Sequence, residues 1–365
     1  MKSAELMACG MVLIAGFMHG QHTQLIGSFS PAGDVGEPRS NHTATLLSDG
    51  KILLVGGFTF ASGHLKDLKS TVVYDPQSGR ASPAGDLIAE RSDHTATLLD
   101  DGRVLIAGGR IDDSVPIKRL ATAELYDPAT RTFSSVGNMR QARDWHASVR
   151  LANGRVLVCG GLSGREESDS AELYDPLSRN FKKAASMLMP RLGHSVTLLQ
   201  DGRVLVASGV FGELYDAGSG RFSKTGKLRT QRVYHSATLL KDGSVLLAGG
   251  MVENEPVASA EAFVPSSGTF LAVGNLKIAR KSHTATLLPD GRVLIFGGTG
   301  PGGTSLSDAE VFDPVQRTFS AAPSSATHRT NHSAVGMPNG TVLLIGGRID
   351  LKHVLSSVDV FRISY

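Results

Sequence analysis

A segment built around one histidine recurs seven times along this chain, and no other feature restricts its fold as strongly. The copies are NHTATLLSDGKILLVGG, DHTATLLDDGRVLIAGG, WHASVRLANGRVLVCGG, GHSVTLLQDGRVLVASG, YHSATLLKDGSVLLAGG, SHTATLLPDGRVLIFGG and NHSAVGMPNGTVLLIGG. Their histidines are His42, His94, His146, His194, His235, His283 and His332, so the repeat is 41 to 52 residues long. Leucine-rich and ankyrin repeats are too short for this period, which fits a unit of four strands.

Each copy contains an Asp-Gly or Asn-Gly pair, from Asp49-Gly50 in the first to Asn339-Gly340 in the last. Such a pair accommodates the positive φ angles of a two-residue type I′ turn, and it lies between two apolar runs. We therefore expect a β-hairpin with a type I′ turn in every copy.

A third and a fourth strand follow each hairpin. The third ends in an aromatic residue: Tyr74, Tyr126, Tyr174, Tyr215, Phe263, Phe312 and Phe361. A second aromatic residue lies seven positions later, at Phe133, Phe181, Phe222, Phe270 and Phe319, with Ala81 in the first copy, and Asp-Pro usually marks the turn between the two. Seven four-stranded antiparallel units packed radially predict an all-β, seven-bladed β-propeller.

The first and last copies complete one another. The seventh copy reaches only its third strand, whereas FSPAGD at Phe29 resembles a fourth strand and lies 13 residues before His42, the spacing of the other copies. We expect the propeller to span residues 28–365 and to be closed by an N-terminal strand, residues 28–34, paired into the last blade.

The Arg-x-x-His opening, the hairpin ending in Gly-Gly and the strand with glutamate and tyrosine resemble kelch repeats. The segment Arg232-Val233-Tyr234-His235-Ser236 is similar to the segment of galactose oxidase that supplies a tyrosine and a histidine to copper. The resemblance implies a binding or interaction module, with a sugar-directed enzyme resembling galactose oxidase or N-acetylneuraminate epimerase as the alternative. A copper-radical site also needs a second tyrosine, a second histidine and a cross-linked cysteine, and this sequence lacks a matching cysteine. We therefore expect no metal and no cofactor, and we assign no catalytic residue.

Residues that recur in every copy are expected to serve the fold. We expect the histidines to cap the innermost strands. An arginine precedes each histidine by three positions: Arg39, Arg91, Arg143, Arg191, Arg232, Arg280 and Arg329. Acidic partners recur two residues before the third-strand aromatic, at Glu124, Glu172, Glu213, Glu261, Glu310 and Asp359. Val72 takes that place in the first blade, so Arg39 is a candidate contact for an anionic ligand.

Function is expected where the copies differ. The connection from Gly-Gly to the third-strand aromatic varies from 6 to 17 residues, and the role of its two longest examples, 58–70 and 110–121, stays open. The residue before each histidine also varies, and we expect Asn41, Asp93, Trp145, Tyr234, Ser282 and Asn331, together with Arg39, to bind ligand at the mouth of the central channel. Trp145, the only tryptophan, suits a sugar or another polar ring, or else plugs the channel. Asp93 and Asp144 are a weaker candidate for an acid and base pair.

The first twenty residues differ from the rest. Lys2 precedes an uncharged apolar run over residues 6–18, which reads as a secretory signal peptide with cleavage near Gly20; an uncleaved anchor and a buried strand are the alternatives. We therefore expect a secreted or periplasmic monomer that binds a protein or a carbohydrate through its variable loops. A net charge of +3 provides no field for nucleic acid or an anionic membrane. Two cysteines, Cys9 and Cys159, exclude a disulfide framework.

Overall fold

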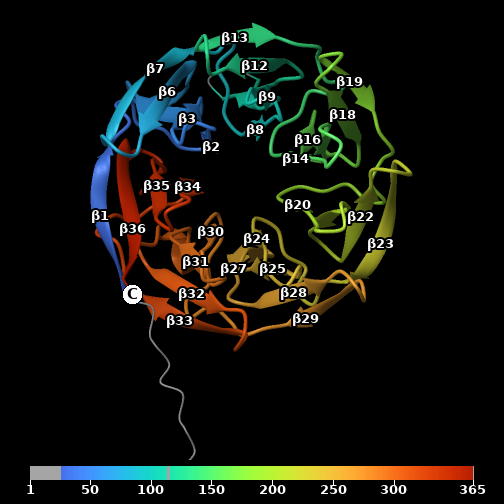
Figure 1. Ribbon diagram of the computed structural model, residues 1–365, viewed down its shortest axis with the longest axis vertical. Helices are drawn as coiled ribbons and strands as arrows, with labels where there is room; N and C mark the ends of the chain where they lie inside the picture. The colour runs from blue at the N-terminus through green and yellow to red at the C-terminus, as the bar shows by residue number, and fades with distance from the viewer. Residues whose placement is uncertain (1–25, 113–115, 365) are drawn as a thin grey trace, which may run out of the picture.

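Seven four-stranded antiparallel sheets form a closed ring in the computed structural model, which describes residues 26–112 and 116–364 (Figure 1). The expected seven-bladed propeller is confirmed. The segment 1–20, predicted to be a signal peptide, lies outside the described residues. No helix in the described part of the chain has the length and apolar character that a membrane crossing requires.

Each blade is a meander from the ring centre outward. The innermost strands are β2 (Thr43–Leu46), β8 (Thr95–Leu98), β14 (Ala147–Arg150), β20 (Ser195–Leu198), β24 (Ser236–Leu239), β30 (Thr284–Leu287) and β34 (Ser333–Gly336). The second strands are β3 (Ile52–Val55), β9 (Val104–Ala107), β15 (Val156–Cys159), β21 (Val204–Ala207), β25 (Val245–Ala248), β31 (Val293–Phe296) and β35 (Val342–Ile345). The third strands are β6 (Ser70–Asp75), β12 (Ala123–Asp127), β18 (Ala171–Asp175), β22 (Phe211–Asp216), β28 (Ala260–Val264), β32 (Ala309–Asp313) and β36 (Ser357–Ser364). The outermost strands are β7 (Arg80–Asp86), β13 (Thr132–Ser135), β19 (Asn180–Lys183), β23 (Arg221–Lys227), β29 (Thr269–Ala272), β33 (Thr318–Ala322) and β1 (Ile26–Asp34).

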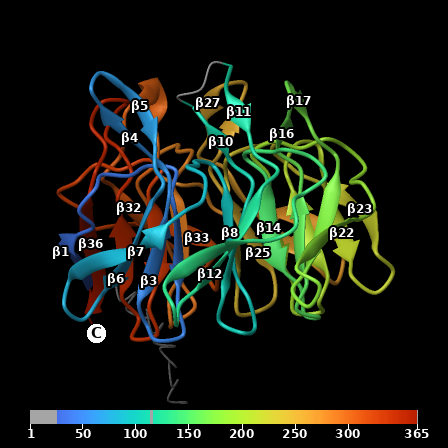
Figure 2. The ribbon, with the colours of Figure 1, turned by 90° about the horizontal axis from the view of Figure 1, so that it is seen from above.

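Smaller elements lie in the variable connections between second and third strands. They are the two-stranded hairpins β4 (Phe58–Ala61) with β5 (His64–Asp67), β10 (Arg110–Ile111) with β11 (Lys118–Arg119), β16 (Leu162–Ser163) with β17 (Glu166–Glu167) and β26 (Met251–Val252) with β27 (Glu255–Pro256), and one 3-10 turn, η1 (Pro301–Gly303). The hairpins rise from the same face of the ring (Figure 2).

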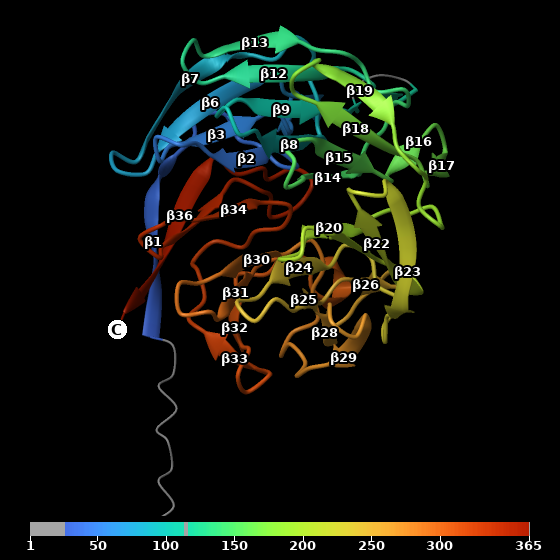
Figure 3. The same cartoon turned by 45° about the vertical axis from the view of Figure 1, so that its right-hand side comes forward.

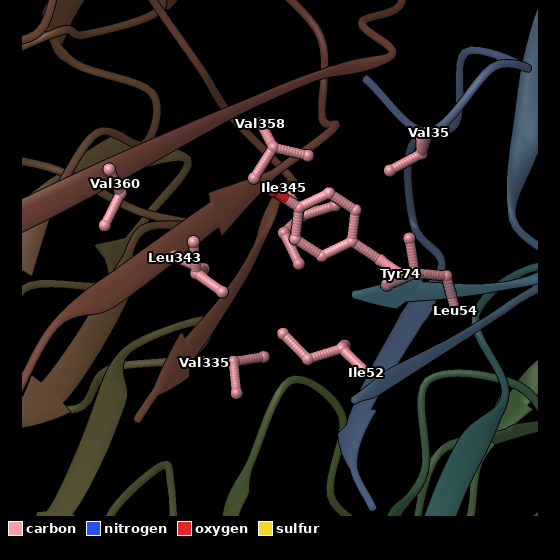
Figure 4. Close-up of a cluster of buried hydrophobic side chains, with 9 residues drawn as sticks. All are labelled: Val35, Ile52, Leu54, Tyr74, Val335, Leu343, Ile345, Val358 and Val360. Carbon is pink, nitrogen blue, oxygen red and sulfur yellow. The ribbon is translucent and has the colours of Figure 1, made fainter. Parts of the chain in front are cut away.

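The hydrophobic core lies between neighbouring blades. Every second strand is an apolar run in which all four residues are buried, because its two faces pack against the blades on either side. Figure 4 shows one such cluster, where Tyr74 and Ile52 of the first blade pack against Ile345 and Val358 of the seventh. Burial is therefore completed only when each blade has two neighbours.

The N-terminal strand closes the ring, as the sequence predicts. β1 pairs antiparallel with β36, and the two strands lie side by side in Figures 1 and 3. Phe29 lies opposite Phe361, with 4.9 Å between the ring centroids, and 5.1 Å from Phe296 of the sixth blade. The pairing extends over residues 26–34, slightly beyond the predicted 28–34.

The predicted hairpins are confirmed, but the predicted turn type is wrong. Only the glycine of each Asp-Gly or Asn-Gly pair has positive φ, for example 81° at Gly50. The Gly50 N–H donates to the Leu47 carbonyl at 3.1 Å, so the loop has one more residue than a type I′ turn. The side chain of Asp49 accepts a bond from the Lys51 N–H at 3.1 Å, and all seven copies repeat this arrangement. The aspartate or asparagine at this position is thus explained by its side-chain bond rather than by a left-handed backbone.

The predicted arginine–acid pairs are confirmed in six blades. All seven arginines are at most 1% exposed, and each donates to the carbonyl of the first glycine of its Gly-Gly pair, or to Ser208 in the fourth blade, at 2.5–3.0 Å. The ion pairs to the acidic residues of the same blade measure 2.6–3.1 Å. Arg39 is the exception, as Val72 predicts. It binds Ser70 Oγ at 3.2 Å, and that hydroxyl donates to Glu37.

The repeated histidines connect blades and do not cap their own strands, which corrects the expectation. In five blades the histidine Nε2 lies 2.8–3.1 Å from a serine or threonine Oγ of the preceding blade, as between His94 and Thr43. That hydroxyl belongs to the residue next to the preceding blade's own histidine. In the fourth blade, His194 lies 3.2 Å from the carbonyl of Cys159. Six of the seven histidines thus form a ring of contacts between blades that is open at His42, whose ring nitrogens have no hydrogen-bond partner among the described residues.

Cys159 lies at the end of β15 and is fully buried, as predicted. Burial raises the pKa of its thiol to about 12, so the reactive thiolate is scarce at neutral pH. In a Cys9→Ser variant, we expect an aromatic disulfide reagent to label less than a tenth of the native protein in an hour, whereas the guanidinium-unfolded chain is labelled at once. Rapid stoichiometric labelling of the native variant would contradict this burial.

Candidate functional site

The residue before each repeated histidine has a left-handed backbone in all seven blades. The φ angles are 51–59° at Asn41, Asp93, Trp145, Gly193, Tyr234, Ser282 and Asn331. Asparagine, aspartate and glycine tolerate this conformation, whereas a large aromatic residue adopts it at a cost of about 1 kcal/mol. The left-handed backbone is therefore unfavourable for Trp145 and Tyr234. The residue type at this position varies among the blades, but its backbone conformation does not.

Backbone hydrogen bonds connect these seven positions into a ring around the axis. The N–H of Asp93 donates to the carbonyl of Asn41, the N–H of Trp145 to that of Asp93, and so on, at 2.7–3.3 Å. Six of the seven links are present; within the described residues, the link from Gly193 to Trp145 is the missing one. The ring is open between the third and fourth blades.

The side chains of Trp145 and Tyr234 meet across the fourth blade. Their ring centroids are 6.4 Å apart and their planes are nearly perpendicular, at 84°. Gly193 makes this contact feasible, because a Cβ there would lie 3.0 Å from two ring atoms of Tyr234. The guanidinium of Arg110 lies 4.5 Å from the centre of the Trp145 ring. The tryptophan is thus held in place between two blades, and it lines the space above them.

A polar network supports the tryptophan from the second blade. Arg110 lies 3.2 Å from Asp93, 2.8 Å from Asp112 and 3.5 Å from Asp144. Asn41 donates to Asp93 at 2.5 Å. Burial raises the pKa of Asp93, and the attraction of Arg110 opposes that rise.

The predicted acid and base pair does not share a cavity. The side chain of Asp144 is fully buried, and Arg119 binds it at 2.8 Å while Arg110 approaches its other oxygen. Asp93 faces the cavity described next, but Asp144 does not line it. The guanidinium of Arg110 lies between the two carboxylates and contacts both of them.

A cavity of about 740 Å³ opens above this network, and six of the seven predicted binding residues line it: Asn41, Asp93, Trp145, Tyr234, Ser282 and Asn331. Arg39, the seventh, is fully buried beneath and does not line the cavity. A contact between Arg39 and a soluble ligand would require the guanidinium to be uncovered. The structure thus brings the variable positions together, and their binding role stays a prediction.

A second row of lining residues follows the Gly-Gly pairs and was missed by the sequence analysis. These residues are Phe58, Arg110, Met251, Thr299 and Arg348. Each forms an antiparallel bridge with the residue that follows the repeated arginine of its blade, and Lys281 and Thr330 of these bridges also face the cavity. The sequence did contain a signal for them: the residue directly after each Gly-Gly pair varies, although the pair itself recurs.

The two longest connections form part of the wall around the cavity. Residues 58–70 carry the hairpin of β4 and β5, and residues 110–121 carry that of β10 and β11. Phe58, Leu65, Arg110 and Asp112 from these connections line the cavity. In the fourth blade, β22 begins only two residues after Gly209, so the wall is low there (Figure 2).

The donor atoms do not fit the copper site of a galactose-oxidase-like enzyme. The Nε2 of His235 is 2.9 Å from Ser195 Oγ and belongs to the ring of contacts between blades. Cys159 is fully buried in β15, and its Sγ lies 3.8 Å from His194 Nε2. Within residues 26–112 and 116–364, no group of three or more histidine, cysteine, aspartate or glutamate residues is arranged to hold a metal ion. Among the described residues, Tyr234 and His235 are thus not joined by the further ligands that such chemistry needs.

Comparisons with known proteins identify the repeat. Residues 91–140, 146–188 and 280–325 match the family profile described as Kelch motif. An F-box/kelch-repeat protein of Arabidopsis thaliana is 29% identical over 126 residues, which cover 34% of this chain and 32% of that protein. Kelch-like protein 38 of Rattus norvegicus is 30% identical over 101 residues, 28% of this chain and 16% of that protein. The chain thus matches a third or less of the length of these relatives.

Two solved structures have a similar fold. A fungal alcohol oxidase of the AA5 family, in complex with copper, superposes with a TM-score of 0.78 at 19% identity, over 93% of this chain and 76% of that one. The protein YjhT superposes with a TM-score of 0.61 at 14% identity, over 80% of this chain and 99% of that one. At these identities the likeness concerns the fold alone.

Proposed function

Because this chain is a kelch-repeat β-propeller, we propose that it works as an interaction module that holds a segment of a partner protein in the cavity at the channel mouth. The observation that carries the proposal is the pair of Trp145 and Tyr234. Both lie in a left-handed conformation that costs about 1 kcal/mol each. Their mutual contact returns about 1 kcal/mol, and the contact of Arg110 with the Trp145 ring returns a similar amount, so the sum is close to zero. Fold stability alone therefore gives no reason to keep aromatic residues at these positions.

The lining favours a protein ligand over a carbohydrate. Tryptophan, tyrosine, methionine and arginine line the cavity together, a composition typical of the centres of protein interfaces. Ile349 and Leu351 also line it and are 43% and 60% exposed, which suits aliphatic contacts with a partner. A sugar would stack on a free aromatic face, and Arg110 already covers one face of Trp145.

Location and assembly belong to the same proposal. We propose that residues 1–20 direct export, which gives a secreted or periplasmic monomer. N-terminal sequencing of protein recovered from the medium or the periplasm tests cleavage near Gly20.

The test of the binding role is a selection of displayed random heptapeptides on the full chain. We expect recovered peptides to bind the wild-type protein and to lose at least about tenfold in affinity for a Trp145→Gly, Tyr234→Gly double variant, by calorimetric titration. The melting temperature should change little, because glycine relieves the left-handed strain while the aromatic contact is lost. Leu177→Asn, at a 97% exposed residue on the opposite face, is the matched control. Equal binding by the double variant would refute the proposed site.

A further inference from the structure

We propose that the partner segment presents an aspartate or glutamate carboxylate, and that Arg348 is the anchor that binds it in the cavity. This inference rests on the proposed interaction role and names the chemistry of the ligand. It follows from a comparison between two arginines at equivalent positions of the fold.

Arg110 and Arg348 each follow a Gly-Gly pair, in the second and seventh blades, and both line the cavity. Each is bridged to the residue after its blade's repeated arginine, Ser92 or Thr330. Arg110 lies within 4 Å of three carboxylates. Arg348 has no such partner within residues 26–112 and 116–364, and its guanidinium makes no hydrogen bond there. One of two equivalent cations is neutralised and the other is left with its donors uncommitted.

The guanidinium of Arg348 is already positioned for a ligand. It lies 5.5 Å from the centre of the Phe58 ring, and its backbone N–H is bound to the Thr330 carbonyl at 3.0 Å. Burial lowers the pKa of Arg348, and the more distant carboxylates of Asp93 and Asp350 offset that effect only in part. A guanidinium presents its N–H groups in a planar fork that matches the two oxygens of a carboxylate.

All the carboxylates of the cavity, and Arg110, already have charged or hydrogen-bonding partners. Asp93 and Asp112 are held by Arg110. Asp350 accepts bonds from the N–H groups of Lys352 at 2.8 Å and His353 at 2.9 Å, and its carboxylate also contacts the His353 ring.

Lys281 is the remaining cation, and its Nζ lies 3.0 Å from Met251 Sδ. Thr299 and Thr330, whose hydroxyls are 2.8 Å apart, connect its bridge to that of Arg348. The positive and negative side chains of the lining are equal in number, so the cavity has no net charge that would attract a carboxylate. The attraction comes instead from the unbonded guanidinium N–H groups of Arg348.

The experiment repeats the heptapeptide selection on three versions of the full chain: wild type, Arg348→Gln and Arg165→Gln. Arg165 is exposed on the same face but does not line the cavity, so its variant loses the same charge without altering the site. We expect aspartate and glutamate to be enriched in peptides recovered by the wild type and by Arg165→Gln, and not in those recovered by Arg348→Gln. Arg348→Lys should restore part of the enrichment, since it restores charge without the fork.

Affinity is then measured with the most frequent peptide and with a copy in which its acidic residues are amides. Fluorescence of Trp145, the chain's single tryptophan, reports binding because its ring lines the cavity. We expect the amide peptide, or the Arg348→Gln variant, to bind at least about tenfold more weakly than the acidic peptide and wild type.

Four results would overturn the inference. Peptides without acidic enrichment, or enrichment that persists in Arg348→Gln, would exclude Arg348 as a carboxylate anchor while leaving the interaction role intact. Recovery of no peptide by any version would instead reject the interaction role itself. Quenching of Trp145 by oligogalacturonate, without any peptide binding, would assign the cavity to an acidic saccharide and reject the protein ligand.

Discussion

Acidification from pH 7 to below about pH 5 is expected to unfold this protein cooperatively, with uptake of several protons per chain. The groups responsible are the seven repeated histidines. Burial, aided by the arginine three residues earlier, lowers the pKa to about 3 in His42, His283 and His332 and to about 4 in His194. The same causes hold the pKa of His94, His146 and His235 well below 6.5.

The sign follows from the difference between folded and unfolded chains. Below pH 6.5 the unfolded chain binds protons on these imidazoles and the folded chain does not, so the free energy of unfolding falls as the pH falls. Each histidine then lowers the free energy of unfolding by up to about 1.4 kcal/mol per pH unit. At pH 5 the seven histidines together lower it by up to about 14 kcal/mol. A typical domain has about 5–15 kcal/mol in total.

Circular dichroism and Trp145 fluorescence, recorded from pH 8 to pH 3 at constant ionic strength, measure this transition. The dependence of the unfolding free energy on pH, from urea titrations between pH 7 and 5.5, gives the number of protons bound. A His146→Gln variant, which removes one titrating group and retains a side chain of hydrogen-bonding capacity, should bind about one proton fewer. A free energy of unfolding that is constant from pH 7 to 4.5 would show that the histidines are not buried as neutral groups.

The fold followed from the sequence because identical environments recur seven times. Glu124 and Arg91 occupy fixed positions in the repeat, and so do their counterparts in the other blades. Their pairing was therefore predictable from the spacing, as was the missing acidic partner in the first blade, where Val72 takes the place of the glutamate. The Phe29 strand was recognisable for the same reason, since it had the spacing of a fourth strand with no blade of its own. Because the repeat occurs seven times, the copies can be aligned with one another and compared position by position.

Features that depend on the relation between blades were not predictable in this way. The spacing places His94 at the start of its strand but does not show that its Nε2 points to Thr43 of the previous blade. The left-handed backbone before each histidine was hidden because Trp145 and Tyr234 do not favour it. Arg348 was overlooked since its lack of partners follows from the three-dimensional surroundings, and Arg110 looks equivalent in sequence. The fold could therefore be predicted from the sequence, but the pairing of the charged side chains at the site could not.

Deleting residues 1–36 is expected to abolish the stable monomer. The deletion removes β1 from the seventh blade, leaves β36 as an unpaired edge strand and takes Phe29 away from Phe361 and Phe296. It also removes Val35, which is 1% exposed in the cluster between the first and seventh blades. Loss of a large buried aromatic residue alone costs about 3–5 kcal/mol, before the strand pairing is counted.

The control for this deletion is a chain that lacks only residues 1–25 and keeps the whole of β1. Calorimetry should give the control a single sharp transition, whereas the longer deletion should melt at least about 15 °C lower or aggregate, because an open propeller has lost the contacts that join its first and last blades. Size-exclusion chromatography distinguishes aggregation through the free edge of β36 from simple unfolding. A peptide of residues 26–36 added to the truncated protein should recover part of the lost stability, since the same backbone and Phe29 contacts re-form. Equal melting temperatures for the two deletions would mean that the ring does not depend on its N-terminal strand.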